Sequence, residues 1–237
     1  MKPEELIIRC SALGKIMTNP RGSGGGLSVT CKGYIEELYL EYEHGIYKTF
    51  WSRYTDKGTR VEKDSIRLAN EVLDWHLEED QIIEEKQPYF RNEYIHGHTD
   101  VCTDWLLADV KSCWSADTFP WFSDKPKSKD NVLQLQGYMW LTGHDESSLA
   151  YCLVNTPEDM ILDEIRREHW KQNSYWNGDE DQEIVDFVRA KHDVERMAKR
   201  LRVKNFIIKR DEDLINRMKE RIEECRNYYA ELLEKEN

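Results

Sequence analysis

The sequence predicts a mixed α/β domain in which a small central mixed sheet is flanked by helices, with a helical extension on the carboxyl-terminal side. Apolar residues recur at helical spacing in the first third of the chain, short β-prone segments follow in the middle, and the chain beyond Pro157 is mostly helical again. The 237 residues suffice for one sizeable core. We therefore expect a single domain over residues 1–237, with a core at about 9–155 and an extension at about 156–237.

The first third of the chain predicts helices around one glycine-rich loop. Ser11–Met17 is expected to form a short helix with Ser11 as its N-cap. Asn19–Leu27 has the composition of a flexible loop. Thr30–His44 and about Thr59–Glu78 carry apolar side chains at helical spacing, so each predicts an amphipathic helix.

The middle of the chain predicts the sheet. Tyr89–Cys102 and Trp105–Cys113 are β-prone segments on either side of a turn, which predicts a hairpin. Ser148–Val154 is an apolar run of strand length, and Val203–Ile208 alternates enough to be an edge strand. The remaining expectations are a loop at Ser115–Asp130 and helices at Asn131–Leu141 and Asp211–Glu234.

The net charge of −12 argues against a broad, nonspecific coating of nucleic acid, because phosphate binding depends on Lys and Arg. The charge is unevenly distributed, however, and Val188–Arg210 is rich in basic residues. We predict that this tract binds successive phosphates of a nucleic-acid backbone through Lys199, Arg200 and Arg202. The alternative is an amphipathic helix with a solvated basic face.

The cysteines, the length of the apolar segments and the amino terminus restrict the class of protein. Six cysteines are scattered without a C-x-x-C pair, which does not indicate a zinc or iron–sulfur site. No stretch approaches the apolar length of a membrane span, and Met1–Arg9 does not resemble a signal peptide. We expect a cytoplasmic protein with reduced thiols.

Carboxylates on the predicted hairpin indicate a metal site. Asp100 ends one β-prone segment in the sequence GHTD, and Asp109 lies on the next in the sequence ADVK, which ends at Lys111. Residues two apart on a strand share a face, so Asp109 and Lys111 point together, and the Val110 carbonyl is available as a further ligand. Mg²⁺ or Mn²⁺ prefers such oxygen ligands and can activate water against a phosphodiester. A nearby lysine can orient or deprotonate that water.

The alternative for Asp109 and Lys111 is an ordinary ion pair on a solvated strand face. Apolar neighbours on both sides predict a central strand instead, where bare charges would be costly. The pattern therefore favours a metal site formed by Asp100, Asp109 and the Val110 carbonyl.

GHTD followed by ADVK resembles the PD-(D/E)XK nuclease superfamily, which has a restriction-endonuclease-like core. Two further matches resemble its lambda-exonuclease, YqaJ and RecB-like branch. One is the upstream helix glutamate Glu62 in GTRVEKDS, and the other is the pair Gln134 and Tyr138 in QLQGY, which is similar to the Q-x-x-x-Y motif. The opening SALGKIMT resembles the serine-bearing helix of lambda-type exonucleases, and VKNFIIKRDEDLINRM resembles the usual ending of the branch.

The resemblance implies a Mg²⁺- or Mn²⁺-dependent deoxyribonuclease. It implies 5′→3′ exonuclease activity on double-stranded DNA ends in phage-type recombination, in the cytosol of a bacterial or phage-infected cell. It further implies a ring-shaped homotrimer and a single-strand-annealing protein as partner. Glu62 would bind the metal directly or through water, and Gln134 and Tyr138 would orient the site or the strand. A structure- or sequence-specific endonuclease with the same site is one alternative, and a DNA-binding or assembly module with a relic site is another.

Two of these motif residues have structural alternatives. Glu62 follows Thr59 at the spacing of a capping box, in which it would return to the Thr59 backbone. Gln134 and Tyr138 lie four residues apart and can simply be neighbours on one helix face.

A phosphate site is expected near the amino terminus. A helix start carrying Ser11, with Arg9 and Lys15 close by, suits a phosphate. The resemblance implies a 5′-phosphate at this serine, although the upstream position at which lambda-type exonucleases have an arginine is Glu4 here.

Two other groups have less definite roles. His96 and His98 are expected to be local hydrogen-bonding groups, because acidic ligands with a lysine favour Mg²⁺ or Mn²⁺ over zinc. Trp121 and Phe122 are expected to anchor their loop, with stacking on bases or contact with a partner as the alternative.

Overall fold

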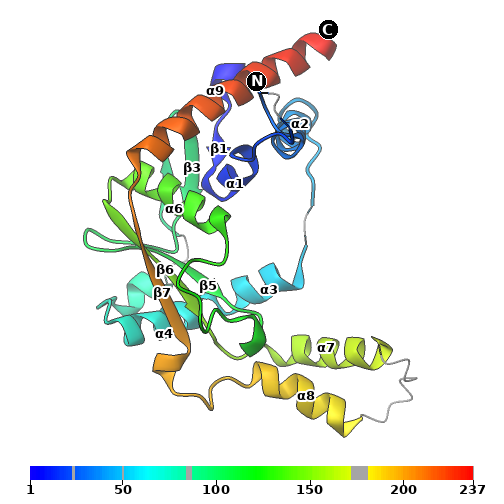
Figure 1. Cartoon of the computed structure of the whole chain (residues 1–237), viewed down its shortest axis with the longest axis vertical. Coiled ribbons are helices and arrows are strands. Elements are labelled where there is room, and N and C mark those ends of the chain that lie inside the picture. The colour runs from blue at the N-terminus through cyan, green and yellow to red at the C-terminus, as the bar shows by residue number, and fades with distance from the viewer. Residues whose placement is uncertain (23–24, 50, 84–86, 172–180, 237) are drawn as a thin grey trace.

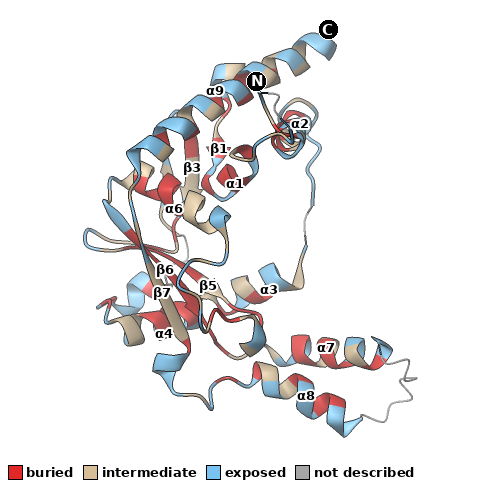
Figure 2. Cartoon of the chain, viewed as in Figure 1, coloured by how far each residue is buried: buried red, intermediate tan, exposed pale blue. Residues whose placement is uncertain are grey.

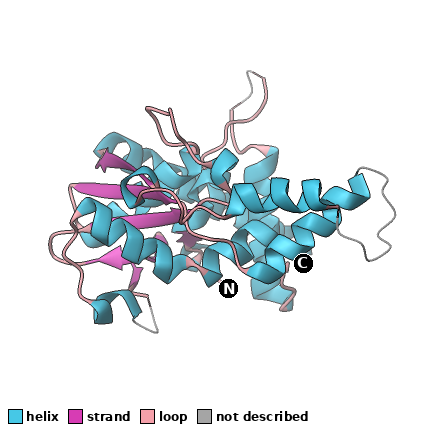
Figure 3. Cartoon of the chain, turned by 90° about the horizontal axis from the view of Figure 1, so that it is seen from below, coloured by secondary structure: helices cyan, strands magenta, loops and turns pink. Residues whose placement is uncertain are grey.

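The computed structural model describes residues 1–22, 25–49, 51–83, 87–171 and 181–236. It confirms the predicted fold class, because a mixed sheet is enclosed by helices (Figures 1 and 3). The helices α2 (Val29–His44), α6 (Lys129–Thr142) and α9 (Glu212–Glu236) lie at one end of the molecule. The pair α7 (Glu158–Lys171) and α8 (Gln182–His192) projects at the other (Figure 1).

The larger sheet carries the predicted site. In the described part of the chain its order is β4 (Val101–Cys102), β5 (Leu107–Ser112), β6 (Glu146–Cys152) and β7 (Val203–Lys209). The two central strands β5 and β6 are parallel and joined through α6 (Lys129–Thr142), whereas the outer pairs are antiparallel. β7 is an edge strand, as predicted.

A helix layer covers each face of this sheet. Ala108 and Val110 of β5 face α4 (Glu62–Leu73) in one apolar cluster, and Leu107 lies in another cluster with residues of α6. Buried residues accordingly concentrate on β5, β6 and the helix faces turned toward them (Figure 2). Because side chains alternate along a strand, Asp109 and Lys111 lie on the α6 face.

The predicted hairpin is only partly correct. Val101 and Cys102 alone pair with β5, while β2 (Tyr89–Arg91) and β3 (Ile95–His98) fold back on each other and join β1 (Ile8–Arg9) in a separate sheet. The reversal follows from Asn92, whose Oδ1 accepts hydrogen bonds from the backbone N–H groups of Tyr94 and Ile95 at 2.9 Å each.

The helix expected at about Thr59–Glu78 corresponds to α4, and its expected start, Thr59 and Arg60, belongs to a separate preceding helix. α3 (Arg53–Arg60) ends at Val61 and α4 begins at Glu62, and a left-handed Asp74 ends α4. The expected capping box is wrong, because the Thr59 hydroxyl donates within α3 to the Thr55 carbonyl at 3.1 Å. The break lets α3 direct Lys57 inward, where its ammonium donates to backbone carbonyls at the ends of β5 and β6. These are the carbonyls of Cys113, Trp114 and Val154.

The first and last helices belong to one core. α1 (Leu13–Ile16) and α2 (Val29–His44) pack against α9 (Glu212–Glu236) in the same apolar cluster (Figure 1). Ser28 caps α2 by accepting from the Cys31 N–H at 3.0 Å. Ser11 is not an N-cap as expected, since it lies inside the 3-10 helix η2 (Cys10–Ala12).

α7 (Glu158–Lys171) and α8 (Gln182–His192) pack on each other around an apolar cluster of their own. The short elements are η1 (Pro3–Glu5), α5 (Glu79–Ile83), η3 (Ala116–Thr118) and η4 (Lys199–Leu201). Of the helices that the structure describes, none is long and apolar enough to cross a membrane.

Candidate active site

Asp109 and Lys111 form the centre of the site. Asp109 is fully buried, and the Lys111 ammonium donates to its Oδ1 at 2.8 Å. Burial acts to lower the pKa of Lys111, but the charges of Asp109 and Asp100 outweigh it and raise the pKa. Lys111 is therefore an ammonium held between two carboxylates. Oδ2 of Asp109 lies 2.8 Å from the same ammonium but makes no hydrogen bond with any described residue.

Asp100 lies opposite, just before β4. Its Oδ2 accepts a hydrogen bond from the Val110 N–H at 2.7 Å. Burial, and then the negative charge of Asp109, raise the pKa of Asp100 to about 8. The charge of Asp109 is thus close enough to disfavour ionisation of Asp100.

The backbone N–H and C=O groups of Val110 point to the edge of β5 on which Asp100 lies. The Leu106 carbonyl accepts from Thr103 on the β4 side, whereas the Cys113 N–H donates to Cys152 on the β6 side. Backbone groups of alternate strand residues point to the same edge. The Val110 carbonyl therefore points away from β6, toward Asp100.

Glu62 joins this group from the other helix layer. It is the first residue of α4, which is tied to β5 by a 2.7 Å hydrogen bond between Ser65 and Ser112. Burial raises the pKa of Glu62, although a hydrogen bond with Gln87 and the charge of Lys111 act to lower it. Gln87 is a contact that sequence reasoning missed, because nothing in its local pattern distinguishes it.

Gln134 and Tyr138 approach from α6. The Gln134 amide donates to the Tyr138 hydroxyl at 2.7 Å, which leaves the phenolic proton available to a further acceptor. Burial raises the pKa of Tyr138, and the charges of Asp109 and Asp100 act in the same direction, so the phenol is neutral. These two residues therefore lie beside the carboxylates and not merely on a shared helix face.

Gly97 allows Tyr138 its position, which the sequence did not reveal. A Cβ at Gly97 would lie 2.8 Å from the Tyr138 ring and 3.2 Å from the Cβ of Cys10. The glycine of GHTD is therefore a packing requirement of the site.

The electrostatics of these residues fit a divalent cation. Among the described residues, no three carboxylate, imidazole or thiolate side chains already form a ligand set. The carboxylates can nevertheless take a cation besides Lys111, since Asp109 has a buried oxygen without a hydrogen bond and neighbouring negative charges act to raise the pKa of Asp100 and Glu62. Oxygen donors of this kind suit a hard cation such as Mg²⁺ or Mn²⁺.

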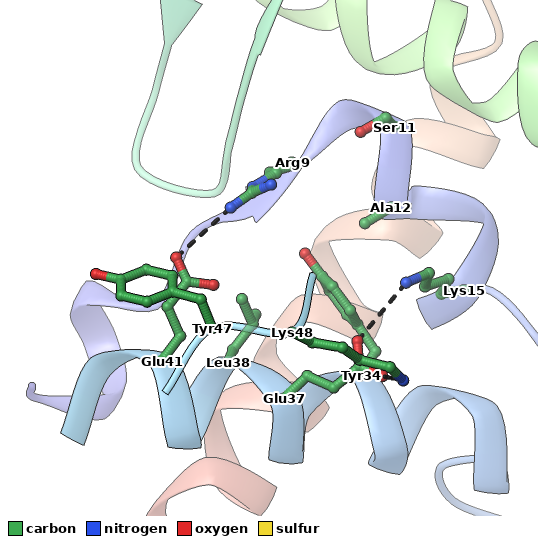
Figure 4. A pocket seen from close by; sticks show the side chains of 10 residues that line it. All are labelled: Arg9, Ser11, Ala12, Lys15, Tyr34, Glu37, Leu38, Glu41, Tyr47 and Lys48. Carbon is green, nitrogen blue, oxygen red and sulfur yellow. Dashed lines mark hydrogen bonds and ion pairs between the residues drawn. The ribbon is translucent and has the colours of Figure 1, made fainter. Parts of the chain in front are cut away.

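The phosphate-binding residues predicted near the amino terminus line one pocket of about 620 Å³ (Figure 4). Arg9, Ser11 and Lys15 contribute to it from the amino-terminal segment, and α2 forms the opposite wall. Two carboxylates of α2 also face the pocket. Glu41 lies 3.5 Å from Arg9 and Glu37 lies 3.8 Å from Lys15, so each cation is already paired.

A second pocket of about 440 Å³ shares Arg9 and Ser11 with the first and is also lined by Tyr138. Arg9 and Ser11 therefore border the same depression as Tyr138, the one catalytic candidate that lines it. His96 and His98 line it too. Burial and the charge of Arg9 lower the pKa of His96, and the His98 Nδ1 donates to the Gln87 carbonyl at 3.1 Å.

The basic tract is only in part the exposed surface that the sequence predicts. Arg202 is buried, with its guanidinium directed at the Leu153 carbonyl, so its assignment to phosphate is corrected. Lys199 is paired with Glu71 at 2.5 Å, and Arg200 is exposed. The alternative of one amphipathic helix is also wrong, because α8 ends at His192 and the tract continues through η4 into β7.

No family model matches the chain, and no curated protein sequence is significantly similar to it. Solved structures are similar. A phage related exonuclease from Haemophilus somnus 129PT superimposes with a TM-score of 0.73 and 27% identity, over 98% of this chain and 97% of the other. An alkaline exonuclease, LHK-Exo from Laribacter hongkongensis, gives a TM-score of 0.60 and 13% identity over 96% and 90%. Its complex with dAMP gives 0.53 and 14% over 98% and 90%.

Proposed function

Because the chain has the fold of the phage-type exonuclease branch of the PD-(D/E)XK superfamily, we propose that it is a metal-dependent deoxyribonuclease. The convergence of Asp100, Asp109 and Lys111 beside Glu62 carries this proposal. A catalytic apparatus of this composition, on a fold shared over almost its whole length with an exonuclease, favours a working enzyme over a relic module.

Each residue has a role that follows from its position. Asp100, Asp109 and the Val110 carbonyl hold the cation, and Glu62 binds it directly or through water. A bound Mg²⁺ or Mn²⁺ would neutralise charge on the phosphate and supply an activated water. The Lys111 ammonium orients the attacking water and stays fixed by Asp109. Tyr138, held by Gln134, donates its phenolic proton toward the phosphate or the strand.

The arrangement of the two pockets favours activity at DNA ends. A terminal 5′-phosphate bound by Ser11, Arg9 and Lys15 would lie in the pocket that adjoins Tyr138. Binding of the terminal phosphate would suit 5′→3′ digestion of duplex ends, since each cut exposes a new 5′-phosphate. Glu37 and Glu41 hold the two cations in place, and the phosphate must compete with these carboxylates for them.

The biological setting rests on the resemblance to the same branch. We place the enzyme in phage-type recombination in a bacterial or phage-infected cytosol, as a ring-shaped trimer beside a single-strand-annealing protein. Lys199 and Arg200 stay candidate DNA contacts.

The decisive experiment compares end-labelled linear duplex, with and without a 5′-phosphate, against closed circular duplex in Mg²⁺, Mn²⁺ or EDTA. We expect cleavage of the linear DNA only with a metal, and faster cleavage of the phosphorylated end, by roughly tenfold or more. Cleavage of the circle would favour an endonuclease instead, and cleavage of neither with any metal would contradict the proposed enzyme.

Asp109→Asn tests the metal site directly. The variant should lose cleavage by at least about a hundredfold, because a first ligand matters more than the outer partners whose loss costs 10–100-fold. Mn²⁺ should raise the Tm of the wild type but not of Asp109→Asn, since only a bound ion stabilises the folded state. Asp104→Asn is the control, because Asp104 is exposed on the neighbouring turn and should leave both readouts unchanged.

A further inference from the structure

The loop between β5 and α6 presents one aromatic side chain to solvent. Phe122 is 96% exposed, although burial of a phenylalanine is favourable and the buried Phe119 is only three residues away. A single exposed apolar residue is ordinary by itself. Phe122 differs from such a residue in the rigidity of its loop, in its position and in the charges that surround it.

The residues beside Phe122 hold the loop in one shape. The Trp121 ring packs on Phe119 with centroids 4.8 Å apart, and its indole N–H donates to the Ala116 carbonyl at 2.7 Å. On the other side, the Ser123 hydroxyl donates to the Lys125 carbonyl at 2.6 Å. Trp121 therefore anchors the loop as expected, whereas Phe122 does not. A preorganised side chain binds with a smaller entropic cost.

The loop is attached to the catalytic strand pair. Tyr151 of β6 stands opposite Lys111 of β5 in the sheet. Its hydroxyl accepts hydrogen bonds from the Lys127 N–H at 3.2 Å and from the Asn131 amide at 3.0 Å. The loop that carries Phe122 is therefore held at the rim of the active site.

The same loop is locally positive in an acidic chain. The net charge of the protein is −12, yet Lys125, Lys127 and Lys129 follow Phe122 within seven residues, with Asp124 as the acidic neighbour. Lys127 donates to the Thr118 carbonyl, and the exposed Lys125 and Lys129 extend the positive charge beyond it. An aromatic face with lysines beside it is the combination that binds single-stranded nucleic acid.

We propose that Phe122 stacks on an unpaired base of the DNA next to the active site, while Lys125 and Lys129 contact the adjoining phosphates. This inference rests on the proposed deoxyribonuclease function. The enzyme would then have a binding site for an unpaired strand, and this site is separate from the 5′-phosphate pocket.

The test measures binding in EDTA, so that the DNA is not cleaved. The probe is a duplex with a short single-stranded overhang that contains 2-aminopurine, whose fluorescence is quenched by stacking, and a blunt duplex is the comparison. Phe122→Ala should weaken binding of the overhang by about tenfold and abolish the quenching, with little effect on the blunt duplex. Phe122→Trp should retain both.

The matched control is Phe187→Ala, which removes another exposed phenylalanine, on α8, and should change neither readout. Lys125→Ala combined with Lys129→Ala should flatten the salt dependence of binding by about one to two in the log–log slope. Unchanged affinity and quenching in Phe122→Ala would overturn the stacking role, and this would leave the cleavage of linear duplex by the wild type intact. Absence of both binding and cleavage in the wild type would instead overturn the proposed function itself.

Discussion

Single side chains decide how much of the site the sequence could reveal. Asp100, Asp109 and Lys111 were predictable because their chemistry is unusual beside apolar strand residues. Gln87 and Gly97 were not, because their importance lies in contacts with Glu62 and Tyr138 that only the folded chain creates. The predicted phosphate ligands Arg9, Ser11 and Lys15 do meet, but the paired carboxylates of α2 could not be foreseen from spacing alone.

Gly97→Ala gives a test at this scale. The new Cβ would lie 2.8 Å from the Tyr138 ring, so the ring or the strand must shift from its position in the site. We expect a loss of about 1–3 kcal/mol in the free energy of unfolding, measured in urea, together with reduced cleavage. Gly58→Ala is the matched control, because open space surrounds Gly58 on α3 and alanine favours the helix. A stability of Gly97→Ala equal to that of the wild type would contradict the packing role of Gly97.

At the scale of elements, periodicity located the long helices and the edge strand but not the breaks between elements. The helix expected at Thr59–Glu78 begins only after Val61, because the preceding α3 directs Lys57 to a different part of the sheet than the apolar face of α4. The expected hairpin divides because Asn92 reverses the chain. A polar side chain that bonds to the backbone two or three residues away leaves no periodic signal.

The α7–α8 pair has a polar anchor that should respond to pH. Glu164 of α7 is buried; it accepts from the Trp114 indole at 2.9 Å and from Arg53 at 3.3 Å, and lies 3.6 Å from His192 of α8. Burial acts to raise the pKa of Glu164, but His192 and Arg53 outweigh it and lower the pKa below the ordinary 4.5. A lowered folded-state pKa stabilises the protein above pH 4.5 and loses this effect as the pH falls through the folded value.

Glu164→Gln should therefore flatten the decline of stability in acid and increase amide hydrogen exchange in α7 and α8 at neutral pH. Asp163→Asn changes a half-buried neighbour, paired only with Arg167 in the ion pairs described, and should leave exchange within the helical pair unchanged. Equal acid dependence in Glu164→Gln and the wild type would rule out this anchor.

At the scale of the whole molecule, α9 packs against the amino-terminal segment. The Arg226 guanidinium donates to the Leu6 carbonyl at 3.2 Å, to the Glu93 carbonyl at 2.5 Å and to Glu223 at 2.7 Å. Three distant parts of the chain thus meet at one buried cation. The sequence predicted an appended helix here, because an amphipathic pattern shows that a face is buried but not against which element.

Arg226→Ala should lower the free energy of unfolding by about 2–4 kcal/mol in one cooperative transition, since it leaves buried carbonyls unpaired. Arg217→Ala removes an exposed arginine from the same helix and should have an effect within about 0.5 kcal/mol. Circular dichroism in urea measures both, and similar midpoints for the two variants would contradict the role of Arg226.

The packing of α9 on α2 also determines when the protein can fold during its synthesis. The ribosome makes α2 first, yet the helix that covers its apolar face, α9, emerges only after the whole sheet has been made. At about 5–20 residues per second, this delay is on the order of ten seconds or more. Throughout it, Cys31, Ile35 and Leu38, all buried in the finished core, face solvent or a chaperone. The nascent chain is therefore expected to depend on chaperone protection until α9 leaves the exit tunnel.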